Sequence, residues 1–196
     1  ISSIYHGRFK TENWNANKEH PPVAKYIYGA ASAFSYRQEG EHFSAGRYAS
    51  AVVLSLAIAT AFYFALSLFS PFIGLLSALI LMLAPSFVAY GRVLGMDSIT
   101  TLMFMLVAVV FYRFANSKAR ARDYILPGVV FGVGCATRYN IVLASTFLPL
   151  AIILFASWRK DWKKWVSLIA IPIISLLTFY LVWPYLWADP INNFMS

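Results

Sequence analysis

The sequence predicts an all-α protein, a polytopic bundle of transmembrane helices with an amphipathic helix at the membrane surface. Apolar residues make up 60% of the chain and charged residues only 12%, whereas roughly a quarter of the residues in soluble domains are charged. The basic residues gather in short clusters between long apolar runs, which is typical of membrane spans and their loops. A proline pair directly ahead of an apolar helical pattern indicates the surface helix.

The composition excludes two other classes of function. The net charge of +8 does not indicate a nucleic-acid partner, because the basic residues are not interleaved with a polar surface. The one cysteine, Cys135, can form neither a disulfide within the chain nor a cysteine-rich metal site. The chain begins in a polar stretch without a signal segment, so we expect it to be a fragment of a longer protein.

Residues 1–47 are expected to form a first extracytoplasmic loop. Pro21 and Pro22 lack N–H groups and have a fixed φ, so they suit the first turn of a helix. Apolar residues then recur at helical spacing and predict a juxtamembrane helix over residues 22–36. The charged stretch 37–47 is expected to be a polar link.

Six apolar runs predict the transmembrane bundle over residues 48–196. A helix rises 1.5 Å per residue, so about 20 residues cross a hydrocarbon core roughly 30 Å thick. Pro85 lies near the far end of the second run, where we expect a kink or an early stop. The predicted spans are residues 48–69, 72–90, 98–114, 124–137, 141–158 and 165–183.

The distribution of Lys and Arg predicts the orientation of these spans. The two densest basic clusters, residues 113–122 and 159–164, are assigned to the cytoplasm by the positive-inside rule. Counting spans from these clusters then places all the unusual polar groups on the outer face. The outer segments are residues 1–47, 91–97, 138–140 and 183–190.

Ionisable residues at span ends on that face are candidates for a functional site. The cations of Lys25, Arg92 and Arg138 would suit an anionic lipid head group, which they would hold by charge-assisted hydrogen bonds. The carboxylates of Asp97 and Glu19 would suit a base or a divalent cation, which also accepts imidazole as a ligand.

Each candidate also has a purely structural interpretation. Asp97 would serve as the N-terminal cap of the third span, and Arg92 and Arg138 as anchors that extend to the interface. Lys25 would simply solvate its helix. The aromatic residues after the sixth span favour an interfacial belt over a sugar-stacking platform; they are Trp183, Tyr185 and Trp187.

Four motifs resemble those of membrane glycosyltransferases of the GT-C fold. Residues 19–25 (EHPPVAK) are similar to the H-P-P-L-x-K of protein O-mannosyltransferases and the E-K-P-P-L of bacterial aminoarabinose transferases. Residues 92–97 (RVLGMD) resemble R-x-x-x-L-D, with Met96 in place of Leu. Residues 137–139 (TRY) resemble T-K-[GY], and residues 183–190 (WPYLWADP) resemble W-P-Y-L-W-x-D-P.

The resemblance implies an inverting transfer of a sugar from a polyprenyl-phosphate carrier to a protein, lipid or glycan acceptor. The enzyme would be integral to the plasma membrane or the endoplasmic reticulum, with its active face extracytoplasmic. The implied substrate-binding residues are His20, Lys25, Arg92, Arg138, Tyr139, Trp187 and Asp189. Asp97 would place the acceptor or a metal. From the residues themselves, a divalent cation, where one is bound, would have Glu19 and His20 as ligands, and the alternative is that no metal is bound.

The family's first outer loop also carries an Asp-Glu pair upstream of the H-P-P motif, and its Asp serves as the base. Residues 1–18 contain no such pair, so we expect it before Ile1, together with a first span. The alternative function is a non-catalytic membrane scaffold or lipid-binding subunit with the same fold. A transporter is disfavoured, because no predicted span carries an ionisable residue near its midpoint.

Overall fold

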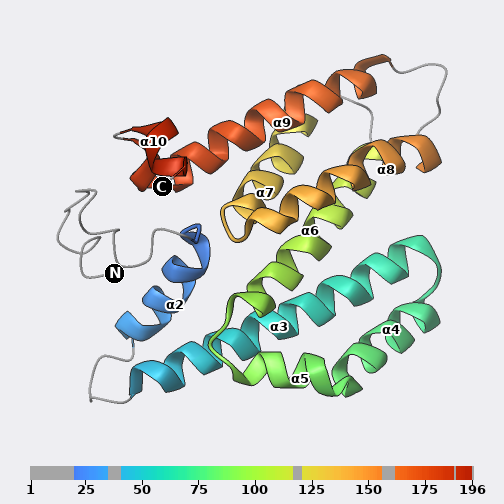
Figure 1. Cartoon of the computed structure of the whole chain (residues 1–196). Coiled ribbons are helices and arrows are strands. Elements are labelled where there is room, and N and C mark those ends of the chain that lie inside the picture. Colours follow the sequence, from blue (N-terminus) through green and yellow to red (C-terminus); the bar gives the residue numbers. More distant parts are fainter. Residues whose placement is uncertain (1–19, 35–40, 117–120, 156–161, 188, 196) are drawn as a thin grey trace.

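The structure is a computed structural model of the chain. It describes residues 20–34, 41–116, 121–155, 162–187 and 189–195. These residues form helices and contain no strand, so the predicted all-α fold is confirmed (Figure 1).

The helices follow one another along the chain, and the three described 3₁₀ helices are marked η. In chain order, the described elements are α2 (Val23–Phe34), α3 (Glu41–Leu68), α4 (Pro71–Leu83), α5 (Pro85–Arg92), α6 (Met96–Asn116), η2 (Ala121–Tyr124), α7 (Ile125–Cys135), η3 (Tyr139–Thr146), α8 (Phe147–Phe155), α9 (Trp162–Val182), η4 (Pro184–Trp187) and α10 (Pro190–Met195).

Three described helices are long and apolar enough to cross a membrane. They contain the stretches Ser44–Leu68, Met96–Asn116 and Trp165–Val182, at the positions of the first, third and sixth predicted spans. Half of the α6 stretch is buried, against 17% of the stretches in α3 and α9. Helix α6 is therefore the central helix, and α3 and α9 present apolar surface outward as helices in contact with lipid do.

The second predicted span is a broken helix. Helices α4 and α5 meet at Ala84 with a bend of 64°. Pro85 has no N–H to continue the hydrogen-bond ladder, and the Ala84 N–H bonds to the Leu81 carbonyl instead, at 3.3 Å. The kink expected near Pro85 is confirmed.

The fourth and fifth predicted spans correspond to shorter apolar helices, Ile125–Cys135 and Tyr139–Ala151. Helix α7 packs closely on α9, because its glycines leave room for the α9 backbone. A Cβ on Gly132 would lie 2.6 Å from the Ser175 carbonyl oxygen, and one on Gly128 would lie 2.6 Å from the Ile174 side chain. The glycine-rich composition of α7 thus reflects close helix packing.

Helix α2 differs in two respects from the expected surface helix. It begins at Val23, after a buried proline pair, and the Pro22 carbonyl accepts the first helical hydrogen bond from Tyr26 N at 3.0 Å. Its inner side also packs on the bundle, with Ala24 2% exposed and Tyr28 8% exposed. Apolar periodicity alone does not distinguish a helix face buried in protein from one buried in lipid.

The polar link is shorter than the sequence suggests. Helix α3 begins at Glu41, so residues 41–47 form its first turns and extend it beyond the apolar run. Residues 1–19 and 35–40, including Glu19, lie outside the described residues.

Candidate functional site

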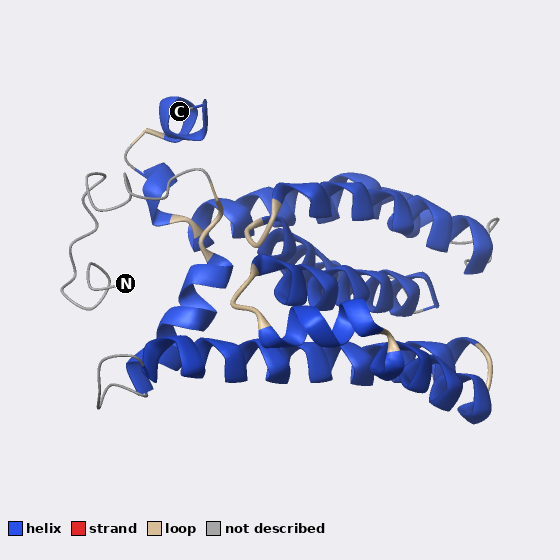
Figure 2. Ribbon diagram, turned by 60° about the horizontal axis from the view of Figure 1, so that its bottom comes forward, coloured by secondary structure: helices blue, strands red, loops and turns tan. Residues whose placement is uncertain are grey.

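Four segments that are distant in sequence meet at one end of the bundle. They are α2, the α5–α6 connection, the corner between α7 and η3, and the end of α9 with η4 and α10 (Figures 1 and 2). The Val23 N–H donates to the Ala136 carbonyl at 3.1 Å, and the Tyr26 hydroxyl donates to the Val182 carbonyl at 3.1 Å. The motif residues in the described part of the chain therefore gather at the same end.

An ion pair joins two of these segments. The Arg138 guanidinium donates to Asp97 Oδ1 at 2.6 Å, and the two side chains are 45% and 48% exposed. Arg138 lies in extended backbone between α7 and η3, and Asp97 lies in the first turn of α6. Since α6 begins at Met96, Asp97 is inside the helix rather than at its cap, and its carboxylate faces a partner from another element.

Hydroxyl groups hold the connection between α5 and α6. The Tyr28 hydroxyl donates to the Gly95 carbonyl and lies 2.9 Å from Ser50 Oγ. Ser50 Oγ in turn donates to the Val93 carbonyl at 2.9 Å. Sequence reasoning missed Tyr28 and Ser50, because a Tyr and a Ser within apolar helices give no local sign of a shared partner.

Lys25 lies at the entry of α2. Its ammonium group donates to the His20 carbonyl at 2.7 Å, and partial burial lowers the pKa of Lys25 below its ordinary value. A lysine in this environment still offers charge to an anion but is less strongly hydrated than an exposed one. Arg92, by contrast, is exposed in the last turn of α5.

The predicted metal site lies partly outside the described residues, so it stays a prediction. The His20 side chain is exposed, and its proposed companion Glu19 lies outside the described residues. Within the described part of the chain, no group of three His, Cys, Asp or Glu side chains could hold a metal ion. These residues do not by themselves fit a metal centre.

The aromatic residues after α9 are mostly internal. Trp183 is 1% exposed and Tyr185 is 4% exposed, so the interfacial-belt interpretation is wrong for both. Tyr139 lies against Trp183, with ring centroids 6.2 Å apart. Trp187 is 47% exposed, and its indole N–H donates to the Tyr180 carbonyl at 2.9 Å.

Tyr139 also borders a cavity of about 560 Å³. Its walls come from α7, η3, α9, η4 and α10, and they are almost entirely apolar. The aromatic residues that line it are Phe131, Tyr139, Phe179, Tyr180 and Phe194. An apolar space therefore lies beside the residue that follows Arg138 in the chain.

The Asp189 carboxylate is hydrogen-bonded to α10, the helix that directly follows it. Its carboxylate accepts hydrogen bonds from the Asn192 backbone N–H at 3.2 Å and from the Asn192 side chain at 2.6 Å. The hydrogen bonds from Asn192 lower the pKa of Asp189. This geometry is that of a cap at the start of α10.

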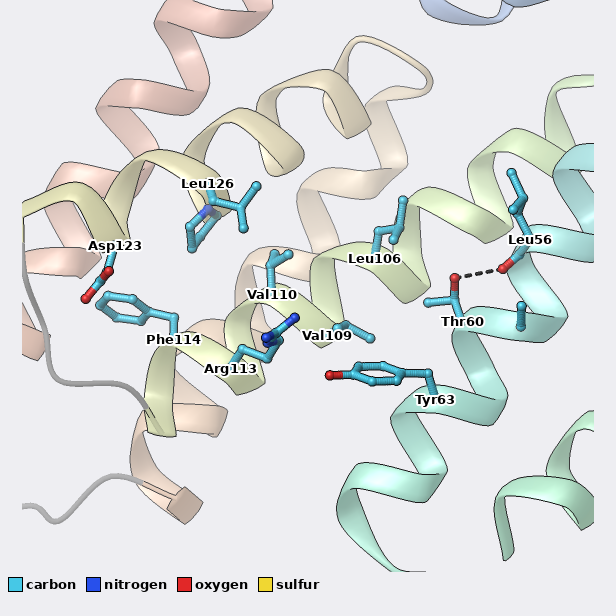
Figure 3. A pocket seen from close by; sticks show the side chains of 12 residues that line it. Leu56, Thr60, Tyr63, Leu106, Val109, Val110, Arg113, Phe114, Asp123 and Leu126 are labelled. Carbon is cyan, nitrogen blue, oxygen red and sulfur yellow. Dashed lines mark hydrogen bonds between the residues drawn. The ribbon is translucent and has the colours of Figure 1, made fainter. Parts of the chain in front are cut away.

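A second cavity, of about 760 Å³, lies along α3, α6 and the start of α7 (Figure 3). Its lining includes Tyr63, Arg113 and Asp123 among aliphatic side chains. None of the motif residues lines it, so it is separate from the site at the other end of the bundle.

The comparison with protein families agrees with the motifs. The family model for dolichyl-phosphate-mannose-protein mannosyltransferases matches residues 19–187. The chain belongs to this family. No curated protein sequence and no solved structure gives a significant match. As a member of the mannosyltransferase family, the chain is a membrane glycosyltransferase of the mannosyltransferase type. The matched range runs from the first motif, before α2, through η4, and therefore covers the segments that meet at the site except for α10.

Proposed function

We propose that the chain belongs to an enzyme that transfers a sugar, with inversion, from a polyprenyl-phosphate carrier to an acceptor on the extracytoplasmic face. The observation that carries this proposal is the Arg138–Asp97 ion pair, which joins a cation from one family-like motif to a carboxylate from another. Lys25 and Arg92 supply two further cations from segments that reach the same end of the bundle.

The proposed role of the cations in this reaction is to stabilise the leaving phosphate. The acceptor hydroxyl attacks the anomeric carbon, the bond from that carbon to the phosphate oxygen breaks, and the carrier phosphate leaves with the electron pair. Arg138 and Lys25 would stabilise the charge that develops on this phosphate. A guanidinium has five N–H donors, so Arg138 can bond to Asp97 and still offer donors to a phosphate.

The proton of the acceptor hydroxyl needs a base. We assign that role to the Asp expected upstream of residue 1, and to Asp97 the placement of the acceptor. His20, Trp187 and Asp189 would border the bound donor or acceptor, with Asp189 acting through the position of α10. The apolar cavity beside Tyr139 supports a lipid-linked donor, since its lining suits hydrocarbon rather than a free nucleotide sugar.

A divalent cation bound by Glu19 and His20 is part of the same proposal. Because the described residues form no metal centre, we derive no step through a metal. Exhaustive chelation of the full-length protein tests this part, and undiminished transfer would remove the metal from the mechanism.

The decisive experiment is a transfer assay with the full-length protein and a polyprenyl-phosphate sugar. Transfer that requires the upstream Asp would support the enzyme. Absence of the upstream Asp-Glu pair from the full-length sequence, together with lipid binding but no transfer, would favour the non-catalytic scaffold instead.

A further inference from the structure

We propose that Tyr28 and Ser50 are positioning residues that hold the α5–α6 connection, residues 93–95, and thereby set the place of Asp97 opposite Arg138. We call this pair of side chains the hydroxyl latch. The expected effect of the latch on catalysis rests on the proposed function. The claim that the latch holds residues 93–95 does not depend on that function.

The latch is buried and comes from two helices outside the connection. Tyr28 lies on α2 and is 8% exposed, and Ser50 lies on α3 and is fully buried. A buried hydroxyl costs free energy unless it is hydrogen-bonded. Both hydroxyls meet this requirement with backbone carbonyls of the same short connection, those of Val93 and Gly95.

The number of protons limits how these bonds are made. Burial is the main reason that the pKa of Tyr28 is raised, so its hydroxyl stays neutral and has one proton, as does the Ser50 hydroxyl. These two protons are available for three hydrogen bonds, which are Tyr28 to Ser50, Tyr28 to Gly95 and Ser50 to Val93. Each hydroxyl donates to its own carbonyl, or one hydroxyl donates to the other, which then donates onward. In each of these arrangements at least one carbonyl of the connection is bound.

Other contacts hold the same connection from different sides. The Ser98 hydroxyl donates to the Tyr90 carbonyl at 2.9 Å and so joins the ends of α5 and α6. The Leu94 side chain lies against Gly46 of α3, where an added Cβ would overlap it. Removal of a latch hydroxyl should therefore leave the protein folded, because these contacts remain, but it takes one of the two hydroxyl donors away from the carbonyls of the connection.

The structural effect should reach Asp97, which follows Gly95 by two residues. Asp97 faces Arg138 from the first turn of α6, so a looser connection changes the separation between the carboxylate and the guanidinium. A displacement of about 1 Å at a reacting group can lower the rate about a hundredfold. The latch thus acts through Asp97 and does not itself touch the substrate.

The test compares Tyr28→Phe with Tyr26→Phe in the full-length protein. Each variant removes one hydroxyl from α2, but the Tyr26 hydroxyl bonds to Val182 of α9 rather than to the connection. The readouts are amide hydrogen exchange over residues 91–98, the thermal midpoint, and kcat and KM for a polyprenyl-phosphate sugar. The exchange readout needs no knowledge of the substrate.

We expect Tyr28→Phe to accelerate exchange over residues 91–98 about fivefold, as for the loss of one hydrogen bond, with a small change in the thermal midpoint. We expect kcat to fall at least tenfold while KM for the donor is unchanged. Tyr26→Phe should not change the exchange of these residues, because the Tyr26 hydroxyl bonds to α9. Ser50→Ala should repeat the effect of Tyr28→Phe.

Unchanged exchange over residues 91–98 in both Tyr28→Phe and Ser50→Ala would overturn the latch. Faster exchange with unchanged kcat would overturn its positioning of Asp97. If the wild-type protein transfers no sugar from any polyprenyl-phosphate donor, the proposed function fails, and the exchange comparison still decides whether the latch exists.

Discussion

Arg138 and Asp97 are 41 positions apart in sequence, yet their side chains approach to 2.6 Å at one end of the bundle. Exposed ion pairs of this kind contribute little to stability, about 0.2–1 kcal/mol. The pair is therefore poorly explained by a contribution to stability, and the role that we propose for it is to hold charge in a fixed position for the reaction.

Asp97→Asn tests the carboxylate. The substitution keeps the size of the side chain and removes its charge, so the free energy of unfolding should fall by no more than about 1 kcal/mol. Turnover with a polyprenyl-phosphate sugar should fall about a hundredfold, because the acceptor is no longer oriented. Steady-state kinetics and thermal unfolding of the full-length variant check both expectations. Turnover equal to that of the wild type would reduce Asp97 to a structural residue.

Arg138→Lys tests the guanidinium. A lysine retains the charge but replaces a planar fork with a point charge, so KM for the donor should rise roughly tenfold or more. Arg113→Lys is the matched control, because Arg113 lies in the cavity at the other end of the bundle. An equal effect of the two substitutions would argue against a phosphate site at Arg138.

The pH dependence of donor binding should report on Lys25. Burial lowers its pKa below 10.5, so donor affinity should fall on the alkaline side before an exposed lysine would lose its proton. Stability should change in the opposite direction. Between the folded-state pKa and 10.5 the unfolded chain binds more protons, so the free energy of unfolding rises with pH.

Lys25→Arg separates Lys25 from other groups that titrate at alkaline pH. An arginine remains charged throughout this range, so the alkaline rise in KM should disappear. Persistence of that rise in Lys25→Arg would assign it to a different group.

Gly132→Ala tests the close approach of α7 to α9. The added methyl group would lie 2.6 Å from the Ser175 carbonyl oxygen, which belongs to the backbone and cannot rotate away. We expect a loss of about 1–3 kcal/mol in the free energy of unfolding. Gly95→Ala is the comparison, since the nearest heavy atom to its Cβ is Asp97 Oδ2 at 3.9 Å. Equal stability of the two variants would contradict this account of the packing.

Cysteine labelling tests the orientation. In a Cys135→Ala background, Gly95→Cys and Ala188→Cys should react with an impermeant reagent from outside sealed cells. Ser117→Cys and Asp161→Cys should react only after permeabilisation. Labelling of Ser117→Cys from outside would reverse the assignment of every loop.

Much of the fold could be predicted from the sequence, because apolar runs and the basic clusters between them are patterns that extend over many residues. The break near Pro85 was predictable for a local reason, the missing N–H. The short helix α7 was harder to predict, because the apolar run of residues 124–137 looks similar whether it faces lipid or packs closely against α9. Trp183 illustrates the same limit, since an aromatic residue at a span end can be buried or interfacial.

The site could be predicted only in outline. The sequence indicated that Asp97, Arg92 and Arg138 lie on one face, but it did not indicate which arginine contacts the Asp97 carboxylate. The structure pairs Asp97 with Arg138, because the corner after α7 reaches the first turn of α6. Contacts over such sequence separations depend on how helices pack, which local patterns do not encode.

The bend at Ala84 is the point about which α5 can rotate, and the hydroxyl latch limits that rotation. Helix α5 has eight residues, so it is about 12 Å long, and a change of 10° at Ala84 would move its Arg92 end by about 2 Å. A rotation of α5 about Ala84 therefore moves the opposite end of the helix most. Tyr28 and Ser50 hold the connection at that end, where a given hydrogen bond limits the rotation most. A substitution at Ala84 should therefore shift Arg92 as effectively as one beside it.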